Sequence, residues 1–406
     1  MAAGPPASLL APSKSAPRMS SMVYLDHSAT TPLDSEVLEA MLPYLTEEFG
    51  NASSVYGLGQ RARQAIDQAR DEVAAFYGVA AREVIFTSGG TEGDNFAFRG
   101  VAERNADHGR HVITSTIEHD AVLRSAEELE REGFEVTRLP VDRTGLINPG
   151  DLARALRKDT ILVSLMHANN EIGTIEPIVE LAAVTHEHSN AYFHTDAVQS
   201  TGKIRTSVEE LGVDLLSMSA HKLHGPKGVG ALIVRSGVRI QPQIVGGGHE
   251  RNRRAGTENV AGIVGLAKAL SIAQRDLHKN TEHLTRLRDR LIEGVLDRIP
   301  RSELTGHPVN RLPHHASFLF QGVEGESLLL QLDMVGIAAS SGSACTSGSL
   351  EPSHVILALG YPRERALGSL RLSVGKGNTD QDVDLLLDQL PGMVGRLRAM
   401  APISAA

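Results

Sequence analysis

The chain has 406 residues, of which 41% are hydrophobic and 22% are charged, and its formal net charge is −9. This composition is typical of a folded globular protein with two or three domains, and it excludes a disordered or fibrous chain. The acidic balance and the lack of basic runs argue against nucleic acid as a partner. A membrane partner is not expected either, because no apolar stretch reaches the roughly 18 residues of a spanning helix.

Residues 1–21 are rich in Ala, Pro and Ser and contain no acidic residue, so we expect a flexible N-terminal tail. From residue 24 onward, helical and strand patterns alternate, beginning with a helix at 60–78, a strand at 83–87 and a Gly-Gly turn. Further strands are predicted at 111–115, 134–139, 160–166, 191–195, 213–218 and 230–234. This alternation predicts an α/β fold with a mainly parallel sheet, whose ligands gather at the carboxyl ends of the strands.

After residue 257 the pattern changes to two long helices, at 259–275 and 280–298, followed by strands near 317–321 and 369–374. This change predicts a second, smaller α/β domain.

The only cysteine, Cys345, lies in the Gly/Ser-rich stretch 340–349 (SSGSACTSGS). Structural cysteines usually sit in apolar runs, whereas a loop of small polar residues leaves a thiol exposed, so we interpret Cys345 as a reactive nucleophile. A single cysteine forms neither an intrachain disulfide nor a CxxC metal site, and we predict no metal centre. The simplest compartment is a reducing one.

Lys222 lies in the stretch 219–228 (SAHKLHGPKG), where a strand ends in a Gly-Pro turn. A partly desolvated amine at such an edge can lose its proton and react with an aldehyde, which is how enzymes hold pyridoxal phosphate. Asp196 ends another strand, and a carboxylate there can keep a pyridine nitrogen protonated, with Gln199 near the ring hydroxyl. The alternatives are a surface lysine beside a turn and an aspartate that caps a helix.

Residues 88–92 (SGGTE) connect a strand to a helix, so their amides, the Thr91 hydroxyl and the helix dipole can hold a phosphate group. The alternative is an ordinary turn of small residues, which is common between strands and helices.

Taken together, these segments resemble the NifS/IscS-type cysteine desulfurases, which are fold-type-I pyridoxal phosphate enzymes of the class-V aminotransferase family. The resemblance runs from about residue 24 to about 398. Its motifs are YLDHSATTP at 24–32, TSGGTE at 87–92, MHANNEIG at 166–173, the Lys222 stretch, GGGHER at 246–251 and the Cys345 loop. It implies a large cofactor-binding domain at 37–277 and a small domain formed by 22–36 and 278–406, which carries the cysteine loop.

The resemblance also implies the role of each site residue. Lys222 would bind the cofactor covalently and serve as the base, His119 would stack on its ring, and Asp196 and Gln199 would contact the ring nitrogen and oxygen. The phosphate would be held by Gly90, Thr91, Ser219 and His221, together with Thr257 from the second subunit of a homodimer. Asn170 and Arg371 would hold the substrate carboxylate, although Arg371 by itself reads as a surface arginine on a strand.

The implied reaction converts L-cysteine to L-alanine and leaves the sulfur as a persulfide on Cys345. A sulfur-acceptor protein, either an iron–sulfur scaffold or a sulfur carrier, would then receive it in the cytoplasm. Two alternatives stay open, a selenocysteine lyase and an inactive scaffold subunit. The serine-rich cysteine loop favours the desulfurase over the lyase, and intact Lys222, His119, Asp196 and Cys345 argue against the scaffold.

Overall fold

The computed structural model describes residues 22–341 and 351–400. The predicted tail at 1–21 and Cys345 lie outside the described residues. Among the described helices, none combines the length and the apolar character needed to cross a membrane.

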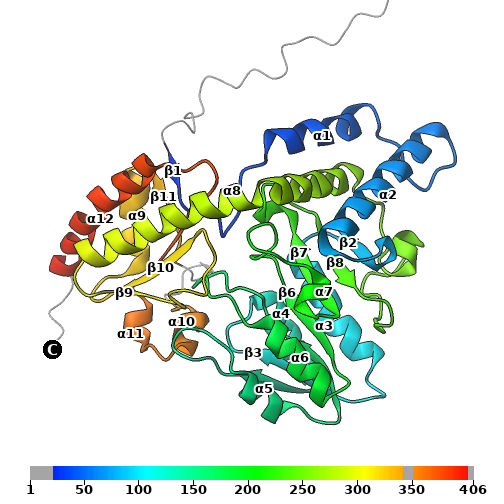
Figure 1. Ribbon diagram of the computed structural model, residues 1–406, viewed down its shortest axis with the longest axis horizontal. Helices are drawn as coiled ribbons and strands as arrows, with labels where there is room; N and C mark the ends of the chain where they lie inside the picture. Colours follow the sequence, from blue (N-terminus) through cyan, green and yellow to red (C-terminus); the bar gives the residue numbers. More distant parts are fainter. Residues whose placement is uncertain (1–21, 342–350, 401–406) are drawn as a thin grey trace, which may run out of the picture.

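A seven-stranded sheet in the order β2-β8-β7-β6-β5-β3-β4 forms the centre of the larger part of the described chain (Figure 1). Its strands are β2 (Val84–Thr87), β3 (His111–Ser115), β4 (Glu135–Leu139), β5 (Thr160–Ser164), β6 (Tyr192–Asp196), β7 (Leu215–Ser219) and β8 (Gly230–Val234). The strands from β7 to β4 pair in parallel, and β8 is antiparallel to both of its neighbours. The predicted α/β fold with a mainly parallel sheet is therefore confirmed, and each predicted strand is present within a few residues.

Helices cover both faces of this sheet, because alternate strand residues point to opposite sides. Val84 and Phe86 belong to one buried cluster and Ile85, between them, to another. The helices of this part are α1 (Ser35–Thr46), α2 (Gly57–Tyr77), α3 (Gly90–Arg104), α4 (Asp120–Arg131), α5 (Pro149–Ala155), α6 (Ile178–His188) and α7 (Val208–Leu211). Helices α3 and α4 pack on the Ile85 side, and α2 and α6 on the opposite side.

Helix α2 shows how the sequence forms these layers. Its buried residues include Ala62, Ile66, Ala69 and Val73, which recur every three or four positions and so form one apolar stripe. The helix ends at Gly78, whose φ of +71° is readily adopted only by glycine.

The smaller part of the described chain contains a three-stranded antiparallel sheet in the order β12-β10-β9 and a parallel pair of β1 and β11. These strands are β1 (Val23–Tyr24), β9 (Ser302–Leu304), β10 (His315–Phe320), β11 (Ile337–Ala338) and β12 (Ser369–Ser373). Their helices are α9 (Gly325–Met334), α10 (His354–Ala358), α11 (Arg363–Ala366) and α12 (Asp380–Met400). Because β1 pairs with β11, the beginning of the described chain belongs to the smaller part together with the C-terminal segments.

The prediction of two helices at 259–275 and 280–298 is wrong, because they form one 39-residue helix, α8 (Val260–Arg298). The mostly polar residues 276–280 resemble a connection, but they include neither glycine nor proline, so nothing in the backbone stops the helix. The first part of α8 belongs to the buried cluster under the large sheet, and the part from Leu284 onward belongs to the cluster of the smaller part. Figure 1 shows α8 extending from the side of α1 and α2 to that of α12. The predicted domain boundary at 277–278 falls within α8, and the division stays a prediction.

Candidate active site

A pocket opens where several strands of the large sheet end at their carboxyl side. The structure brings ten of the twelve predicted site residues together there: Gly90, Thr91, His119, Asn170, Asp196, Gln199, Ser219, His221, Lys222 and Arg371. Of the other two, Cys345 lies outside the described residues, and Thr257 is exposed and does not line the pocket.

Lys222 enters the pocket from a short 3-10 turn, Ala220–Lys222, that directly follows β7. Its Nζ donates to the carbonyl oxygens of Ser28 and Ala29, both at 2.7 Å. Burial, reinforced by the nearby Arg371 guanidinium and opposed by the charges of Asp196 and Asp26, lowers the pKa of Lys222 to about 8. At neutral pH a useful fraction of this amine is therefore unprotonated, as reaction with a carbonyl group requires.

The N-terminus of α3 forms the side of the pocket that suits an anion. Gly89, just before the helix, has φ of +155°, and a Cβ on Gly90 would lie only 2.6 Å from Val198 Cγ2. Both positions therefore need glycine. The backbone N–H groups in the first turn of a helix have no acceptor within the helix, and the dipole of this 15-residue helix adds positive potential. Ser219 and His221 line the same pocket.

Asp196 and His119 approach the pocket from neighbouring parts of the sheet. Asp196 ends β6 and is buried, which raises the pKa of its carboxyl, while the nearby His119 and Lys222 act in the opposite direction. Its Oδ1 accepts from Val198 N at 2.8 Å, but no helix begins there, so the helix-cap interpretation is wrong.

His119 does cap a helix, α4, since its Nδ1 accepts from Ala121 N at 3.1 Å. A neutral His119 therefore carries its proton on Nε2.

Arg371 brings a guanidinium group to the pocket. It lies on β12 with 6% of its surface exposed, so the interpretation as a surface arginine is wrong. Its Nη2 donates to Asp26 Oδ1 at 2.7 Å and its Nη1 to the Asn170 carbonyl oxygen at 3.0 Å. Within the described part of the chain, the buried Nε has no hydrogen-bond partner. Arg371 thus retains a donor for an incoming carboxylate, next to the Asn170 side chain.

The sequence prediction missed two buried acids near Asp196. Asp94 lines the pocket, and burial raises its pKa well above the ordinary value, with the Asp196 charge adding to the effect. Burial likewise raises the pKa of Glu118 to about 8. Helical spacing was an available signal for Asp94, because it follows Gly90 by four residues and so shares its face of α3.

The chain belongs to the class-V aminotransferase family, whose sequence model matches residues 23–386. It is 54% identical to a protein of Methanosarcina thermophila named cysteine desulfurase IscS, over 94% of each chain. A solved structure titled NifS-like protein superimposes with a TM-score of 0.87 at 39% identity, covering 92% of this chain and 100% of that one. A structure titled SspA in complex with cysteine has a TM-score of 0.77 at 34% identity, over 87% and 98% of the two chains. The family and fold expected from the sequence motifs are confirmed.

The cofactor of this family, pyridoxal phosphate, fits the residues present. It needs an amine, an anion site and an acid for its ring nitrogen, and the pocket offers Lys222, the α3 N-terminus and Asp196.

Proposed function

We propose that this pocket binds pyridoxal phosphate and converts L-cysteine to L-alanine, which makes the chain a cysteine desulfurase. The observation that carries the proposal is the meeting of Lys222, Asp196, the α3 N-terminus and Arg371 in one pocket. The similarity to cysteine desulfurases over nearly the whole chain supports it.

Different residues of the pocket would bind different groups of the cofactor and the substrate. Gly90, Thr91, Ser219 and His221 would hold the phosphate, and Asp196 and His119 would bind the ring from its nitrogen edge and its face. Gln199 would donate to the ring oxygen. When bound, the cofactor links to the substrate amine and accepts the electrons left behind when a proton leaves the α-carbon.

Arg371 and Asn170 would hold the substrate carboxylate, which fixes the α-carbon in front of Lys222. The pKa of about 8 leaves part of the Lys222 amine unprotonated and able to take the α-proton at neutral pH. The thiolate of Cys345 would then attack the substrate sulfur, so that an S–S bond forms as the C–S bond breaks. A proton delivered to the β-carbon and the return of a proton to the α-carbon then complete L-alanine.

We further propose a homodimer. Leu38, Leu42 and Leu45 recur along one face of α1 and are 48%, 50% and 58% exposed, while Val37 and Met41 on the other face are buried. A helix that is apolar on both faces leaves one face to be covered, and a second copy of the chain would cover it. Phe49, 72% exposed, extends the patch beyond the end of α1. Exposed Thr257 would then reach the phosphate site of the second subunit. Light scattering that shows an active monomer at micromolar concentration would contradict this.

We infer that a sulfur-acceptor protein, either an iron–sulfur scaffold or a sulfur carrier, takes the sulfur from Cys345 in the reducing cytoplasm. Incubating the Cys345 persulfide with candidate acceptors and following the sulfur by mass spectrometry identifies the partner.

The deciding experiment compares the unmodified protein with Cys345→Ser. The unmodified protein should release alanine from L-cysteine and carry a trapped persulfide on Cys345, whereas the variant should bind cofactor and cysteine yet release almost no alanine. Alanine release by the variant at the unmodified rate would rule out the persulfide step, and a preference for selenocysteine would then favour the lyase. No turnover by the unmodified, cofactor-loaded protein would favour the inactive scaffold.

A further inference from the structure

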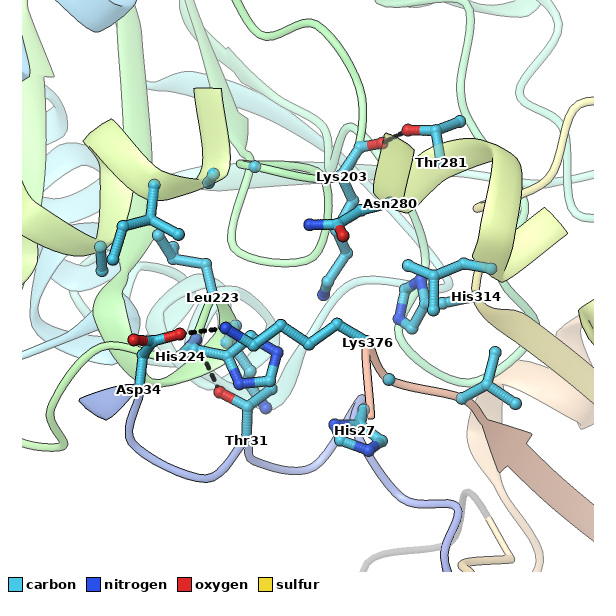
Figure 2. Close-up of a pocket in the computed structure, with 18 of the residues that line it drawn as sticks. His27, Thr31, Asp34, Lys203, Leu223, His224, Asn280, Thr281, His314 and Lys376 are labelled. Carbon is cyan, nitrogen blue, oxygen red and sulfur yellow. Dashed lines mark hydrogen bonds and ion pairs between the residues drawn. The ribbon is translucent and has the colours of Figure 1, made fainter. Parts of the chain in front are cut away.

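A second cavity lies next to the active-site pocket, and Lys222 lines both. Figure 2 shows its walls, which come from the segment around His27 and Asp34, the turn at Lys203, the middle of α8, and the residues after β12. The titratable and charged groups around it are His27, Asp34, Lys203, Lys222, His224, His314 and Lys376. Lys376 forms an ion pair with Asp34, so the carboxylate of this cavity is already neutralised.

Lys203 extends into this cavity and belongs to none of the sequence motifs that define the family resemblance. In Figure 2 its side chain points into the space between Leu223, His314 and Lys376. Within residues 22–341 and 351–400, no carboxylate lies within ion-pair distance of its amine. Burial, reinforced by the charges of Lys222 and Arg371, lowers the pKa of Lys203 to about 7. A buried amine without a counterion lowers stability, so packing alone does not account for lysine at this position.

Lys203 connects to the active site through hydrogen bonds. Its Nζ donates to Gln199 Oε1 at 3.4 Å, and Gln199 Nε2 donates to the Ser28 carbonyl oxygen at 2.9 Å. The same carbonyl accepts from Lys222 Nζ at 2.7 Å. An ammonium group only donates and a carbonyl oxygen only accepts, so the two contacts of Gln199 together define which end of its amide faces which neighbour.

We propose that Lys203 is a positioning residue of the active site, which fixes the Gln199 amide and interacts electrostatically with Lys222. With Gln199 Oε1 facing Lys203, the Gln199 NH2 group faces Ser28, and one of its hydrogens remains for an oxygen of the cofactor ring. The charge of Lys222 is one cause of the lowered pKa of Lys203, so the two amines repel each other. The inference rests on the proposed roles of Gln199 and Lys222.

The first test uses cofactor-free protein and needs no turnover. Competitive acetylation with acetic anhydride across pH 5 to 11, read for each lysine by peptide mass spectrometry, gives the midpoint at which each amine loses its proton. We expect a Lys203 midpoint near pH 7 in the unmodified protein and a higher Lys203 midpoint in Lys222→Met, because the charge of Lys222 is one cause of the lowered pKa. Exposed Lys158 is the control, since Lys158→Met should leave the Lys203 midpoint unchanged.

The second test separates the hydrogen bond from the charge. Lys203→Met should lower kcat/KM about tenfold, the effect of losing one hydrogen bond from a charged group, without lowering the melting temperature. Lys203→Gln can still donate to Gln199 but is uncharged, so it should recover most of kcat/KM.

An unchanged Lys203 midpoint in Lys222→Met, together with kcat/KM within twofold of the unmodified protein in both Lys203 variants, would overturn the inference. Equal losses of activity and melting temperature in both variants would also overturn it, because they indicate a structural role. If the unmodified protein fails to release alanine, the proposed function fails, whereas the acetylation midpoints still decide whether the two lysines interact.

Discussion

Glu250→Gln should destabilise the fold through a single buried ion pair. Arg70 on α2 donates from Nη1 and Nη2 to the two oxygens of Glu250, both at 2.7 Å, and the side chains are 4% and 3% exposed. Glu250 Oε2 also accepts from Phe86 N at 3.1 Å. The substitution preserves the shape of the side chain but leaves the Arg70 guanidinium buried without a counterion.

Breaking a buried pair by removing one partner costs about 3 to 5 kcal/mol, and glutamine should fall near 3 because its amide oxygen still accepts one hydrogen bond. The unfolding entropy of a chain of 406 residues is about 0.85 kcal/mol/K, so the melting temperature should fall by about 4 °C. The effect should also reach the active site. Glu250 begins a turn in which it, Arg251 and Asn252 have φ of +46°, +57° and +63°, and this turn leads toward Thr257.

Differential scanning calorimetry of cofactor-free protein measures the change, and titration with pyridoxal phosphate measures cofactor affinity. The matched control is Glu127→Gln, which removes the partner of Arg124 in a pair that is 70% and 39% exposed. An exposed pair contributes at most about 1 kcal/mol, so this variant should melt within about 1 °C of the unmodified protein. Equal melting temperatures for the two variants would refute the reasoning.

Four further predictions concern the site and the chain end. Lys222→Ala should abolish turnover and covalent cofactor attachment, and borohydride reduction with peptide mapping that finds the cofactor on Lys227 would reassign the role. The rate at which cofactor-free protein binds pyridoxal phosphate covalently should rise with pH, with a midpoint near pH 8, because only the unprotonated Lys222 amine attacks an aldehyde. A midpoint near 10.5, the ordinary lysine value, would contradict the lowered pKa of Lys222. Arg371→Lys should raise KM for L-cysteine about 10- to 100-fold in steady-state assays, because lysine lacks the planar fork that pairs with a carboxylate. An unchanged KM would show that another residue binds the substrate carboxylate. Deleting residues 1–21 should leave melting temperature and turnover unchanged, and a clear loss of either would show that this segment docks on the fold.

Local sequence patterns predicted the strands and part of the pocket, because buried β-rich runs mark strand ends and ligands collect where parallel strands end. Lys222 and Asp196 were found in this way. Only the family resemblance supplied the roles of His119, Ser219, His221, Asn170 and Arg371. Patterns of this kind carry no information on tertiary pairing, so the contact of Arg371 with Asp26, 345 positions away, and that of Arg70 with Glu250 were not predicted. The continuous α8 was missed for a related reason. Its polar middle resembles a loop in the sequence, and only the structure shows that its two ends pack in different buried cores.

The number of residues in helix α8 sets the relative orientation of the two buried cores that its ends enter. Its 39 residues extend about 58 Å, and none of residues 274–283 is among its buried residues. One residue inserted there would rotate Leu284, Leu287 and Leu291 by about 100° relative to the other end, away from the cluster they now enter. Four inserted residues would restore their direction to within about 40° but move them about 6 Å along the axis. Such an insertion would displace the part that carries Arg371 relative to the part that carries Lys222. The length of α8 therefore sets the distance between the Lys222 amine and the Arg371 guanidinium, although α8 contributes no residue to the pocket that these two side chains line.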